Sequence, residues 1–360
     1  MENTVIIRNA NKLPVPTWRW LKLNDNTIAC DKTGSRVNIE PQILNLPDKI
    51  TIEKNVPADF PAVKTGIGTD ADEFVHTHAF EHNTVTIEEN AVISEPVSFI
   101  YKLNDNNFCT HADYIHAKKN SCATLIFVYT SPYDAAGLHG AGLKILAEEN
   151  AQINIIQLQT LGRNFTCFYD IGTTAADSAK ITLRQIALGG RKNWLGIHAD
   201  LKQHNTVLKL NLDYIAGQNQ NIDINYVAAI HGQKNNVQIT ANGILMHNAQ
   251  KTMRGTLDFK QGCKGSVGNE SENVLLLDED IQNKSIPLIL CGEDDIEGNH
   301  SASIGEMDEA QLFYLYTRGL SDAQIRRMQI DAKIQLICND LPQSLHEYVL
   351  NYEKNFKEAV

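Results

Sequence analysis

The sequence lacks several features that would assign it to a class at once. No apolar run among its 360 residues approaches the roughly 20 residues that a membrane-spanning helix needs. The first residues, MENTVIIRNANKLPVPTWRWLK, contain no basic stretch followed by an apolar core, which is the pattern of a secretion signal. We therefore expect a cytoplasmic protein without a membrane partner.

Positive charge is also scarce. The chain has 32 Lys and Arg residues against 43 Asp and Glu residues, which gives a formal net charge of -11 at pH 7. Nucleic acids and anionic membranes bind positively charged surfaces more tightly, because binding releases counterions. Neither is therefore expected to be the main partner of this acidic chain. Proteins and small ligands remain as partners.

Two sequence motifs with clear chemistry are missing. None of the seven cysteines stands in a CxxC pair, and in a chain without a secretion signal an odd number of cysteines favours free, mostly buried thiols. The glycine-rich stretch GLHGAGLK, which begins at Gly137, lacks the GxxxxGK[ST] order that binds phosphates, so we expect no ATP hydrolysis by this chain.

A repeat of short alternating segments fills the middle of the chain. Each segment has apolar residues at its fourth and sixth positions; the segments are NAQINI from Asn150, SAKITL from Ser178, NTVLKL from Asn205, NQNIDI from Asn219 and KNNVQI from Lys234. The fourth positions, 153, 181, 208, 222 and 237, are separated by 28, 27, 14 and 15 residues. Weaker copies fall at Asn164 and Asn193. A strand about every 14 residues favours a parallel β-helix, with an antiparallel sandwich as the alternative.

The two ends of the chain differ from this middle. The prolines and tryptophans of the start indicate a small mixed segment, whereas the end carries three helix-start patterns, Asp308 with Gln311, Ser321 with Gln324 and Ser344 with Glu347. An apolar stripe in the second of the three helices is predicted at Ile325, Met328, Ala332 and Leu336. We therefore divide the chain into an N-terminal mixed segment (1–85), a parallel β-helix core (86–300) and a C-terminal helical domain (301–360).

Several side chains suggest chemistry by their type. His76, His78 and His82 would form a metal site if they shared one side of a strand, but no carboxylate or thiolate motif accompanies them, and exposed loop or strand histidines are the favoured interpretation. The acidic run from Glu293 to Glu297 is compatible with a carbohydrate-active enzyme or, more simply, with a solvated rim. His300 with a thiolate of Cys263 or Cys291 would suit a soft metal, although one chain supplies too few ligands for a complete iron-sulfur cage.

The segment 253–328 resembles the C-terminal signature of the SufB/SufD family of iron-sulfur cluster assembly scaffold proteins. The motifs that carry the resemblance are RG at Arg254, ESENVLLL from Glu270, DD at Asp294, HSASIG from His300 and LFYLYTRGL from Leu312. PTWRWLKLND, from Pro16, resembles the N-terminal region of the SufD branch. The resemblance implies a mainly β fold, with a right-handed parallel β-helix between an N-terminal segment and a C-terminal helical domain.

The resemblance also implies a role and partners. Members of the family are non-catalytic scaffolds that build iron-sulfur clusters in a SufBCD complex with the ATPase SufC, which docks on the C-terminal helices. The predicted SufC-docking side chains are Leu312, Phe313, Leu315, Arg318 and Ile325. A purely intramolecular core is the alternative role for such apolar side chains.

Two departures favour the SufD branch. Ile281 stands where SufB has its essential cysteine, and Ser301 follows His300 where SufB tends to have an acidic residue. By resemblance, His300 is the candidate iron or cluster ligand at the interface with SufB. Many SufD proteins have a cysteine two places before this histidine, whereas this chain has Gly298. The alternatives are a surface histidine without a metal role, a SufB-like scaffold that binds the cluster itself, and a β-helix carbohydrate-active enzyme.

We expect no cofactor to be stably bound by the isolated chain. A nascent iron-sulfur cluster or iron would be shared with SufB, and the resemblance leaves open whether FAD binds the complex. The choice between a monomer and a homodimer also stays open, although the exposed edge strand of a β-helix favours pairing.

Overall fold

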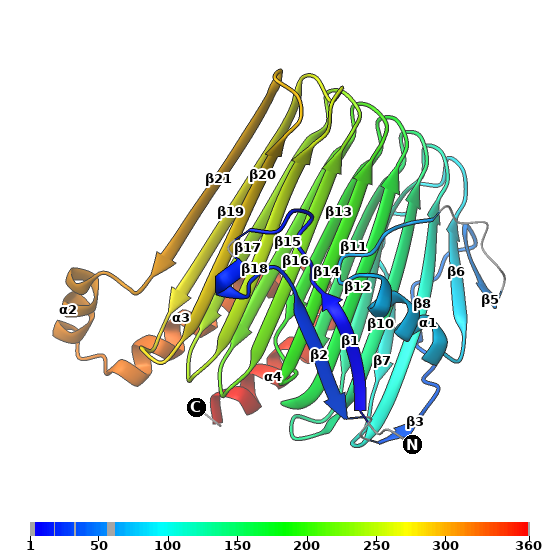
Figure 1. The fold of residues 1–360 in the computed structure, drawn as a ribbon. Coiled ribbons are helices and arrows are strands. Elements are labelled where there is room, and N and C mark those ends of the chain that lie inside the picture. Colours follow the sequence, from blue (N-terminus) through cyan, green and yellow to red (C-terminus); the bar gives the residue numbers. More distant parts are fainter. Residues whose placement is uncertain (1–3, 18, 32–33, 56–61, 359–360) are drawn as a thin grey trace.

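The computed structural model describes residues 4–17, 19–31, 34–55 and 62–358. Two long sheets run side by side, and from residue 82 onward successive strands alternate between them (Figure 1). One pass through both sheets is one coil of a β-solenoid, whose strands run from His82 to Gly305. The predicted mainly β solenoid, preceded by a small mixed segment and followed by helices, is confirmed.

The two sheets of the solenoid have a simple strand order. The first sheet has the order β20-β18-β16-β14-β12-β10-β8-β6-β5, with β3 paired to β8, and the second has the order β21-β19-β17-β15-β13-β11-β9-β7-β4. The strands of the first sheet are β3 (Ser35–Arg36), β5 (Ile50–Lys54), β6 (His82–Ile87), β8 (Asn107–Ala117), β10 (Ala136–Ala147), β12 (Asn164–Ala175), β14 (Lys192–Leu201), β16 (Asn221–Ile230), β18 (Gln250–Phe259) and β20 (Gln282–Cys291). Those of the second are β4 (Gln42–Leu44), β7 (Val97–Lys102), β9 (Cys122–Thr130), β11 (Gln152–Thr160), β13 (Lys180–Ala187), β15 (Val207–Ala216), β17 (Asn236–Leu245), β19 (Ser266–Leu276) and β21 (Ile296–Gly305).

The register of the strands explains the repeat in the sequence. Ile153 of β11 lies opposite Ile181 of β13, which in turn lies opposite Leu208 of β15. The spacings of 28 and 27 residues therefore correspond to one full coil. The spacings of 14 and 15 residues correspond to half a coil, because Ile222 belongs to β16 in the other sheet. The weaker copies at Asn164 and Asn193 belong to β12 and β14. Neighbouring coils pair in parallel, so the antiparallel sandwich is wrong.

Asparagine occurs at the turns because of its backbone preferences. Asn90, Asn120 and Asn150 occupy equivalent turns with φ angles of 59°, 56° and 58°, a left-handed conformation that asparagine tolerates better than most residues. Their side chains also bond to one another: Nδ2 of Asn120 donates to Oδ1 of Asn90 at 2.9 Å, and Nδ2 of Asn150 donates to Oδ1 of Asn120 at 3.1 Å. The repeated asparagines thus form equivalent turns and join each turn to the next.

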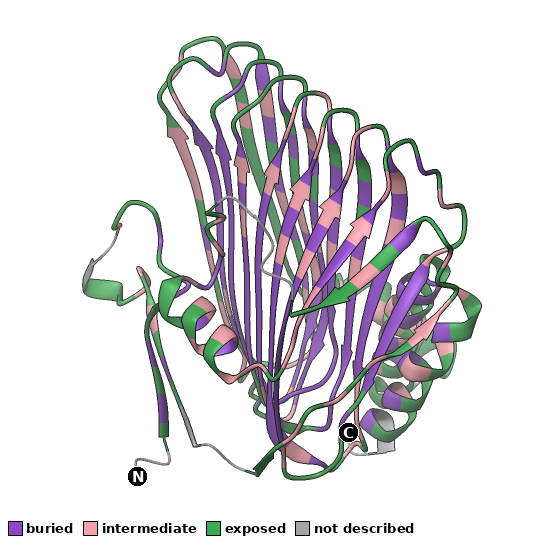
Figure 2. Ribbon diagram, turned by 90° about the vertical axis from the view of Figure 1, so that its right-hand side faces the viewer, coloured by how far each residue is buried: buried purple, intermediate pink, exposed green. Residues whose placement is uncertain are grey.

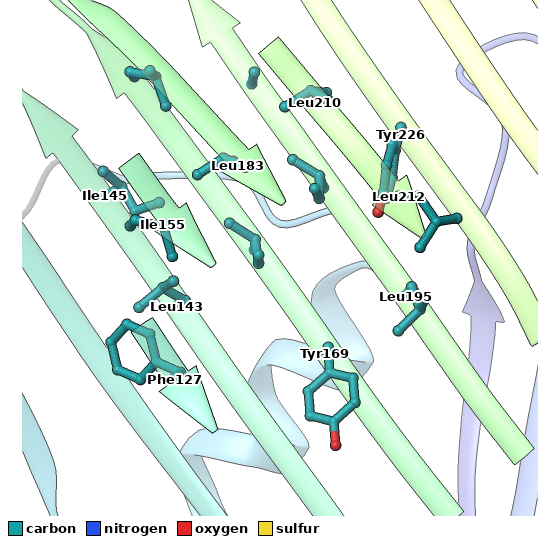
Figure 3. Packing of buried hydrophobic residues seen from close by; sticks show 14 of the residues in the cluster. Phe127, Leu143, Ile145, Ile155, Tyr169, Leu183, Leu195, Leu210, Leu212 and Tyr226 are labelled. Carbon is teal, nitrogen blue, oxygen red and sulfur yellow. The ribbon is translucent and has the colours of Figure 1, made fainter. Parts of the chain in front are cut away.

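A single apolar core runs along the inside of the solenoid. Figure 3 shows Leu143 and Tyr169 from the first sheet together with Ile155 and Leu183 from the second, and all four buried side chains belong to one cluster. These positions alternate with outward-facing ones, as expected for strands that bury one face. Truncation of one such side chain, for example Leu183→Ala, is expected to lower the free energy of unfolding by about 2–5 kcal/mol.

The N-terminal elements cover the outer face of the first sheet (Figure 2). They are the antiparallel pair β1 (Thr4–Ala10) and β2 (Asn26–Asp31), the short 3-10 helix η1 (Arg19–Leu21) and the helix α1 (Thr69–His78). Asp223 of β16 anchors the hairpin: Nδ2 of Asn11 donates to its Oδ1 at 2.6 Å, and Nδ2 of Asn26 donates to its Oδ2 at 2.8 Å. Polar side chains therefore fix the hairpin on the solenoid.

The C-terminal helices lie on the opposite side, against the outer face of the second sheet (Figure 2). They are α2 (Glu309–Thr317), α3 (Asp322–Asn339), the 3-10 turn η2 (Gln343–Leu345) and α4 (His346–Glu358). Ile334 of α3 and Val349 of α4 pack in one cluster with Ile126 and Leu158 of the sheet. The helix α2 makes no such contact, since none of its residues is buried, and it projects from the body (Figure 1).

The predicted helix starts are confirmed in two of three cases. Asp308 accepts hydrogen bonds from the amides of Ala310 and Gln311 at the start of α2, and Ser321 with Gln324 forms a reciprocal capping box at the start of α3. Ser344 instead lies inside η2, because Pro342 begins a 3-10 turn whose carbonyl accepts from the amide of Leu345 at 2.8 Å. The predicted helix start at Ser344 is therefore wrong.

The predicted apolar stripe of α3 is correct at one end only. Ile325 is buried, but Met328 and Leu336 are 43% and 62% exposed. The buried face carries Ile330, Ile334 and Ile337. Apolar residues occupy both faces of this helix, and the outer face of the second sheet covers only the isoleucine face.

The boundaries proposed at residues 85/86 and 300/301 stay predictions. The solenoid itself continues beyond residue 300, since β21 ends at Gly305. Of the helices that the structure describes, none is both long and apolar enough to span a membrane.

Candidate functional site at the end of the solenoid

The C-terminal end of the solenoid is open. Within the described residues, β20 and β21 are the last strands of their sheets, and neither has a neighbour on its far side (Figure 1). Their backbone N–H and C=O groups are therefore available for pairing along two edges. The inward side chains of this last coil are also left uncovered, because no further coil among the residues that the structure describes stacks on them.

His300 lies at the middle of β21, on this open end. It stands directly opposite Glu270 in the parallel pairing of β19 with β21. In-register neighbours of a parallel sheet point to the same side, and Glu270, Glu272 and Val274 are buried at alternate positions of β19. The side chain of His300 therefore belongs to the inward set, yet it is exposed because it is in the last coil.

A buried ion pair lies inside the solenoid near this end. The ammonium group of Lys251 in β18 pairs with the carboxylate of Glu272 in β19, and Lys251 also donates to Oγ of Ser285 at 3.1 Å. Burial lowers the pKa of Lys251, and the negative charge of Glu272 opposes this effect. The positive charge of Lys251 is therefore paired with the carboxylate of Glu272.

Within the described part of the chain, Glu270 forms no such ion pair. Burial above all, and then the charge of Glu272, raise the pKa of Glu270 to about 7, while Lys251 acts in the opposite direction. Its Oε2 is buried and, among the described residues, accepts no hydrogen bond. Its carboxyl group occupies the space beside Gly255 of β18, where an added Cβ would lie 1.9 Å from Oε1. The glycine of the RG motif is required by this close approach.

The described part of the chain contains no group of three or more His, Cys, Asp or Glu side chains placed to hold a metal ion. His300 is therefore not joined with Cys263 and Cys291 in such a group. Cys291 is exposed at the end of β20, whereas Cys263 is buried and burial raises the pKa of its thiol. Any metal at His300 needs further ligands from elsewhere.

The described cysteines are free thiols, as predicted. Cys109, Cys167, Cys263 and Cys338 are buried, Cys122 is half-buried and Cys291 is exposed. The side chain of Cys30 lies outside the described residues. Burial raises the pKa of Cys109 and of Cys167 to about 12, so both are protonated at neutral pH.

Of the three clustered histidines, His82 begins strand β6, but the other two do not lie on a strand. His76 and His78 belong to α1, whose helical turn separates positions i and i+2, so the predicted loop or strand placement is wrong for both. His76 Nδ1 lies 3.1 Å from Oδ1 of Asp72, and its Nε2 lies 3.0 Å from the hydroxyl of Tyr114. The contact with Tyr114 of β8 joins α1 to the first sheet, whereas the contact with Asp72 lies within the helix. Both contacts give His76 a structural role.

Glu293, Asp294 and Asp295 of the acidic run lie in the turn between β20 and β21, and Glu297 lies in β21. Glu293 accepts a hydrogen bond from the amide of Gly262 at 2.9 Å, and this bond is the main reason that its pKa is lowered. A general acid of a glycosidase needs the opposite shift. Asp294 and Asp295 are exposed beside it, which fits the solvated rim better than an enzyme.

The α2 surface, which we define as Leu312, Phe313, Tyr314, Leu315, Tyr316 and Arg318, carries four of the five predicted docking side chains. Phe313 is 69% exposed, and Tyr314 and Tyr316, which the sequence interpretation did not include, are 55% and 46% exposed. The guanidinium of Arg318 lies over the ring of Tyr314, 5.1 Å from its centroid. Ile325 is only 2% exposed, so it belongs to the intramolecular packing.

A groove of about 1160 Å³ lies between one side of α3 and the outer face of the second sheet, beside the packed isoleucines of the helix. Its floor is a row of polar residues on successive strands, Asp213, Asn242, Asn273 and Ser303, and the exposed Leu336 is on its helical wall. Arg184 pairs with Asp213 at 2.7 Å and with Asp340 at 2.8 Å, which holds the end of α3 to the sheet. None of the predicted site residues lines this groove.

Comparison with known proteins gives a family match over most of this structure. The model of the family described as SUF system FeS cluster assembly, SufBD core domain, matches residues 99–333. The match begins in β7, includes every later strand of the solenoid and ends within α3.

Curated relatives are distant in sequence. The iron-sulfur cluster assembly protein SufD of Bacillus subtilis (strain 168) is 24% identical over 297 residues, which cover 78% of this chain and 65% of the relative. An iron-sulfur cluster assembly SufBD family protein of Staphylococcus saprophyticus is 23% identical over 287 residues, covering 76% of this chain and 58% of the relative. One from Mycobacterium tuberculosis is 24% identical over 291 residues, which cover 31% of that relative. The chain thus spans less than two thirds of the length of these relatives.

Proposed function

Because this chain belongs to the SUF system iron-sulfur cluster assembly family through its SufBD core domain, we propose that it is a SufD-type, non-catalytic scaffold subunit. It works in the cytoplasm within a SufBCD complex and assists the assembly or transfer of iron-sulfur clusters. Iron, sulfide and the nascent cluster are its cargo. Two kinds of surface support the proposal, the open end of the solenoid and the α2 surface.

The observation that carries the proposal is the position of His300. Its side chain is exposed at the middle of an edge strand that is paired on one side only, and the described chain supplies no group of three or more metal ligands around it. A neutral imidazole is a competent iron ligand. A single histidine ligand on an edge strand that can pair with another chain is suited to a metal site to which two chains contribute ligands.

SufB is the proposed partner at this end. Pairing of its edge with β20 and β21 would satisfy the unpaired backbone groups and face its essential cysteine toward His300. Ile281 of this chain, at the position of that cysteine, leaves the thiolate to come from SufB. In the absence of SufB, the same edges allow two copies of this chain to pair.

SufC is the proposed partner of the α2 surface. Exposed aromatic side chains with an adjacent arginine are typical of side chains that anchor a protein interface. Because α2 follows β21 by a short link, Glu306 to Asp308, movement of α2 by the ATPase would be transmitted to the open end. ATP-driven pairing of SufC could thereby open the shared site.

Co-expression of this chain with SufB and SufC from the same genome tests the proposal. We expect a complex of all three chains on size-exclusion chromatography, and SufC alone should still bind this chain. Absence of binding to both partners would contradict the proposal. A cluster that forms on the isolated chain in place of the complex would instead indicate the SufB-like role.

A further inference from the structure

His300 has a close neighbour that no motif connects with metal binding. Glu270 lies directly beneath it, one strand further into the solenoid, and adjacent parallel strands are about 4.8 Å apart. No hydrogen bond joins the two side chains in the described structure, although imidazole and carboxyl groups pair readily. The side chains of His300 and Glu270 thus lie on the same side of the sheet without a hydrogen bond between them.

The carboxyl group of Glu270 has an unused oxygen. The residue is 6% exposed, and its Oε2 is buried without a hydrogen-bond partner among the described residues. The nearby cation is already engaged, since Lys251 pairs with Glu272 and with Ser285. A buried carboxylate oxygen without a partner is costly unless a proton or a cation compensates it.

The surroundings fix this carboxyl group at one place. Gly255 leaves the space that the carboxyl group occupies, and any side chain there would collide with it. Pro287 of the last coil lies opposite Gly255, as His300 lies opposite Glu270. The carboxyl group therefore lies inside the coil formed by β18 and β19, and His300 belongs to the last coil, β20 and β21, which pairs with that coil.

We propose that Glu270 is the second ligand that this chain contributes to the iron(II) ion held by His300. The inference rests on the proposed function, because His300 is a ligand only if this end of the solenoid receives iron. A nitrogen and a carboxylate oxygen suit iron(II), a borderline divalent cation. The two residues are in register on adjacent strands and on one side of the sheet, so rotation of the exposed imidazole about its side-chain torsions would direct its ring toward the carboxyl group. Two ligands from one chain leave the other coordination positions to the partner subunit.

Cobalt(II), added alone to the isolated chain under anaerobic conditions, is the probe for this site, because its visible absorption reports nitrogen and oxygen ligands. We expect Glu270→Gln and His300→Ala each to weaken cobalt binding about tenfold or more. Glu297→Gln is the matched control, since it removes the same charge from an exposed position of β21. It should change the affinity less than twofold. No binding to the wild type, or wild-type binding by Glu270→Gln, would overturn the proposal.

A second variant covers the case in which Glu270→Gln does not fold. Glu270→Asp keeps the charge but shortens the side chain by one methylene, which moves both carboxylate oxygens away from the metal. It should therefore lose cobalt affinity to a similar extent. Wild-type affinity of this variant would contradict the ligand role.

The experiments distinguish failure of the ligand inference from failure of the proposed function. If the complex with SufB and SufC forms but the Glu270 variants bind cobalt with wild-type affinity, only the ligand inference is wrong. If cobalt binding depends on Glu270 but no complex forms, the proposed function is wrong and the metal site stands.

Discussion

Arg254 and Asp223 form a buried ion pair in which Nη1 lies 2.6 Å from Oδ1, and their side chains are 2% and 4% exposed. The same arginine donates from Nε to the carbonyl oxygen of Leu23 at 2.8 Å, in the segment between β1 and β2. Asn11 and Asn26 bond to the same aspartate. One arginine of the family-like motif thus joins the N-terminal hairpin to the solenoid.

Replacement of Asp223 by alanine should leave the guanidinium of Arg254 buried without a counter-ion. We expect the free energy of unfolding to fall by about 3–5 kcal/mol, with faster hydrogen exchange in the hairpin. Asp134→Ala is the control, because Asp134 is 76% exposed in its pair with Arg163 and should contribute less than about 1 kcal/mol. Unchanged exchange in β1 and β2 would contradict the anchoring role.

Asp170 should make stability depend on pH. Burial is the main cause that raises its pKa from 3.8 to about 7, Asp72 adds to the rise, and the Ile67 amide, Thr65 and Lys144 oppose it. The folded state therefore binds the proton more tightly than the unfolded state. Its contribution to stability is complete below about pH 4 and is lost as the pH rises through about 7.

Urea unfolding of the wild type and of Asp170→Asn across this pH range measures the effect. The wild type should lose more stability than the variant as the pH rises, because an amide cannot ionise. The segment of residues 62–68 should loosen with it, since the amide of Ile67 donates to Oδ1 of Asp170 at 2.7 Å. Parallel pH profiles of the two proteins would show that this carboxyl group does not contribute.

The thiols should differ sharply in reactivity. Cys109 and Cys167, with pKa values raised to about 12 by burial, should resist alkylation in the folded chain, whereas the exposed Cys291 should react first. Peptide mapping after short exposure to iodoacetamide distinguishes the sites. Early modification of Cys109 or Cys167 would mean that the interior of the solenoid opens readily.

The α2 surface should bind SufC chiefly through its aromatic residues. Phe313→Ala should weaken SufC binding by about 2 kcal/mol or more without a loss of thermal stability, because the side chain is 69% exposed. Leu350→Ala on α4, 48% exposed, is the matched control and should bind normally. Ile325→Ala should instead destabilise the chain itself by about 2–5 kcal/mol. Normal SufC binding by Phe313→Ala would place the docking surface elsewhere.

Local patterns were sufficient to predict the solenoid. Ile153, Ile181 and Leu208 repeat because each coil reproduces the same turn and the same inward positions, so sequence spacing directly reports structural register. Helix packing was harder to predict. Met328 and Ile330 are both apolar, and only contact with the second sheet decides which one α3 buries. The spacing of His76 and His78 indicated a strand face, but these residues form a helix against the first sheet.

The site could be predicted only in part. His300 was found through its motif, but the role of Glu270 depends on which residue lies opposite it, thirty positions away along the chain. Two acidic residues at alternate positions of a buried strand, Glu270 and Glu272, were the available signal. Their separate roles follow from Lys251, whose pairing with Glu272 alone is a feature of the packed interior.

The most direct test of the account is the amount of iron and sulfide on the complex with SufB and SufC, purified anaerobically with wild-type chain or with His300→Ala. Ser301→Ala is the matched control, because it changes the neighbouring exposed residue on the other face of β21. We predict that the His300→Ala complex assembles normally but carries little cluster, whereas the control is loaded like the wild type. Equal iron and sulfide on all three complexes would contradict the ligand role of His300.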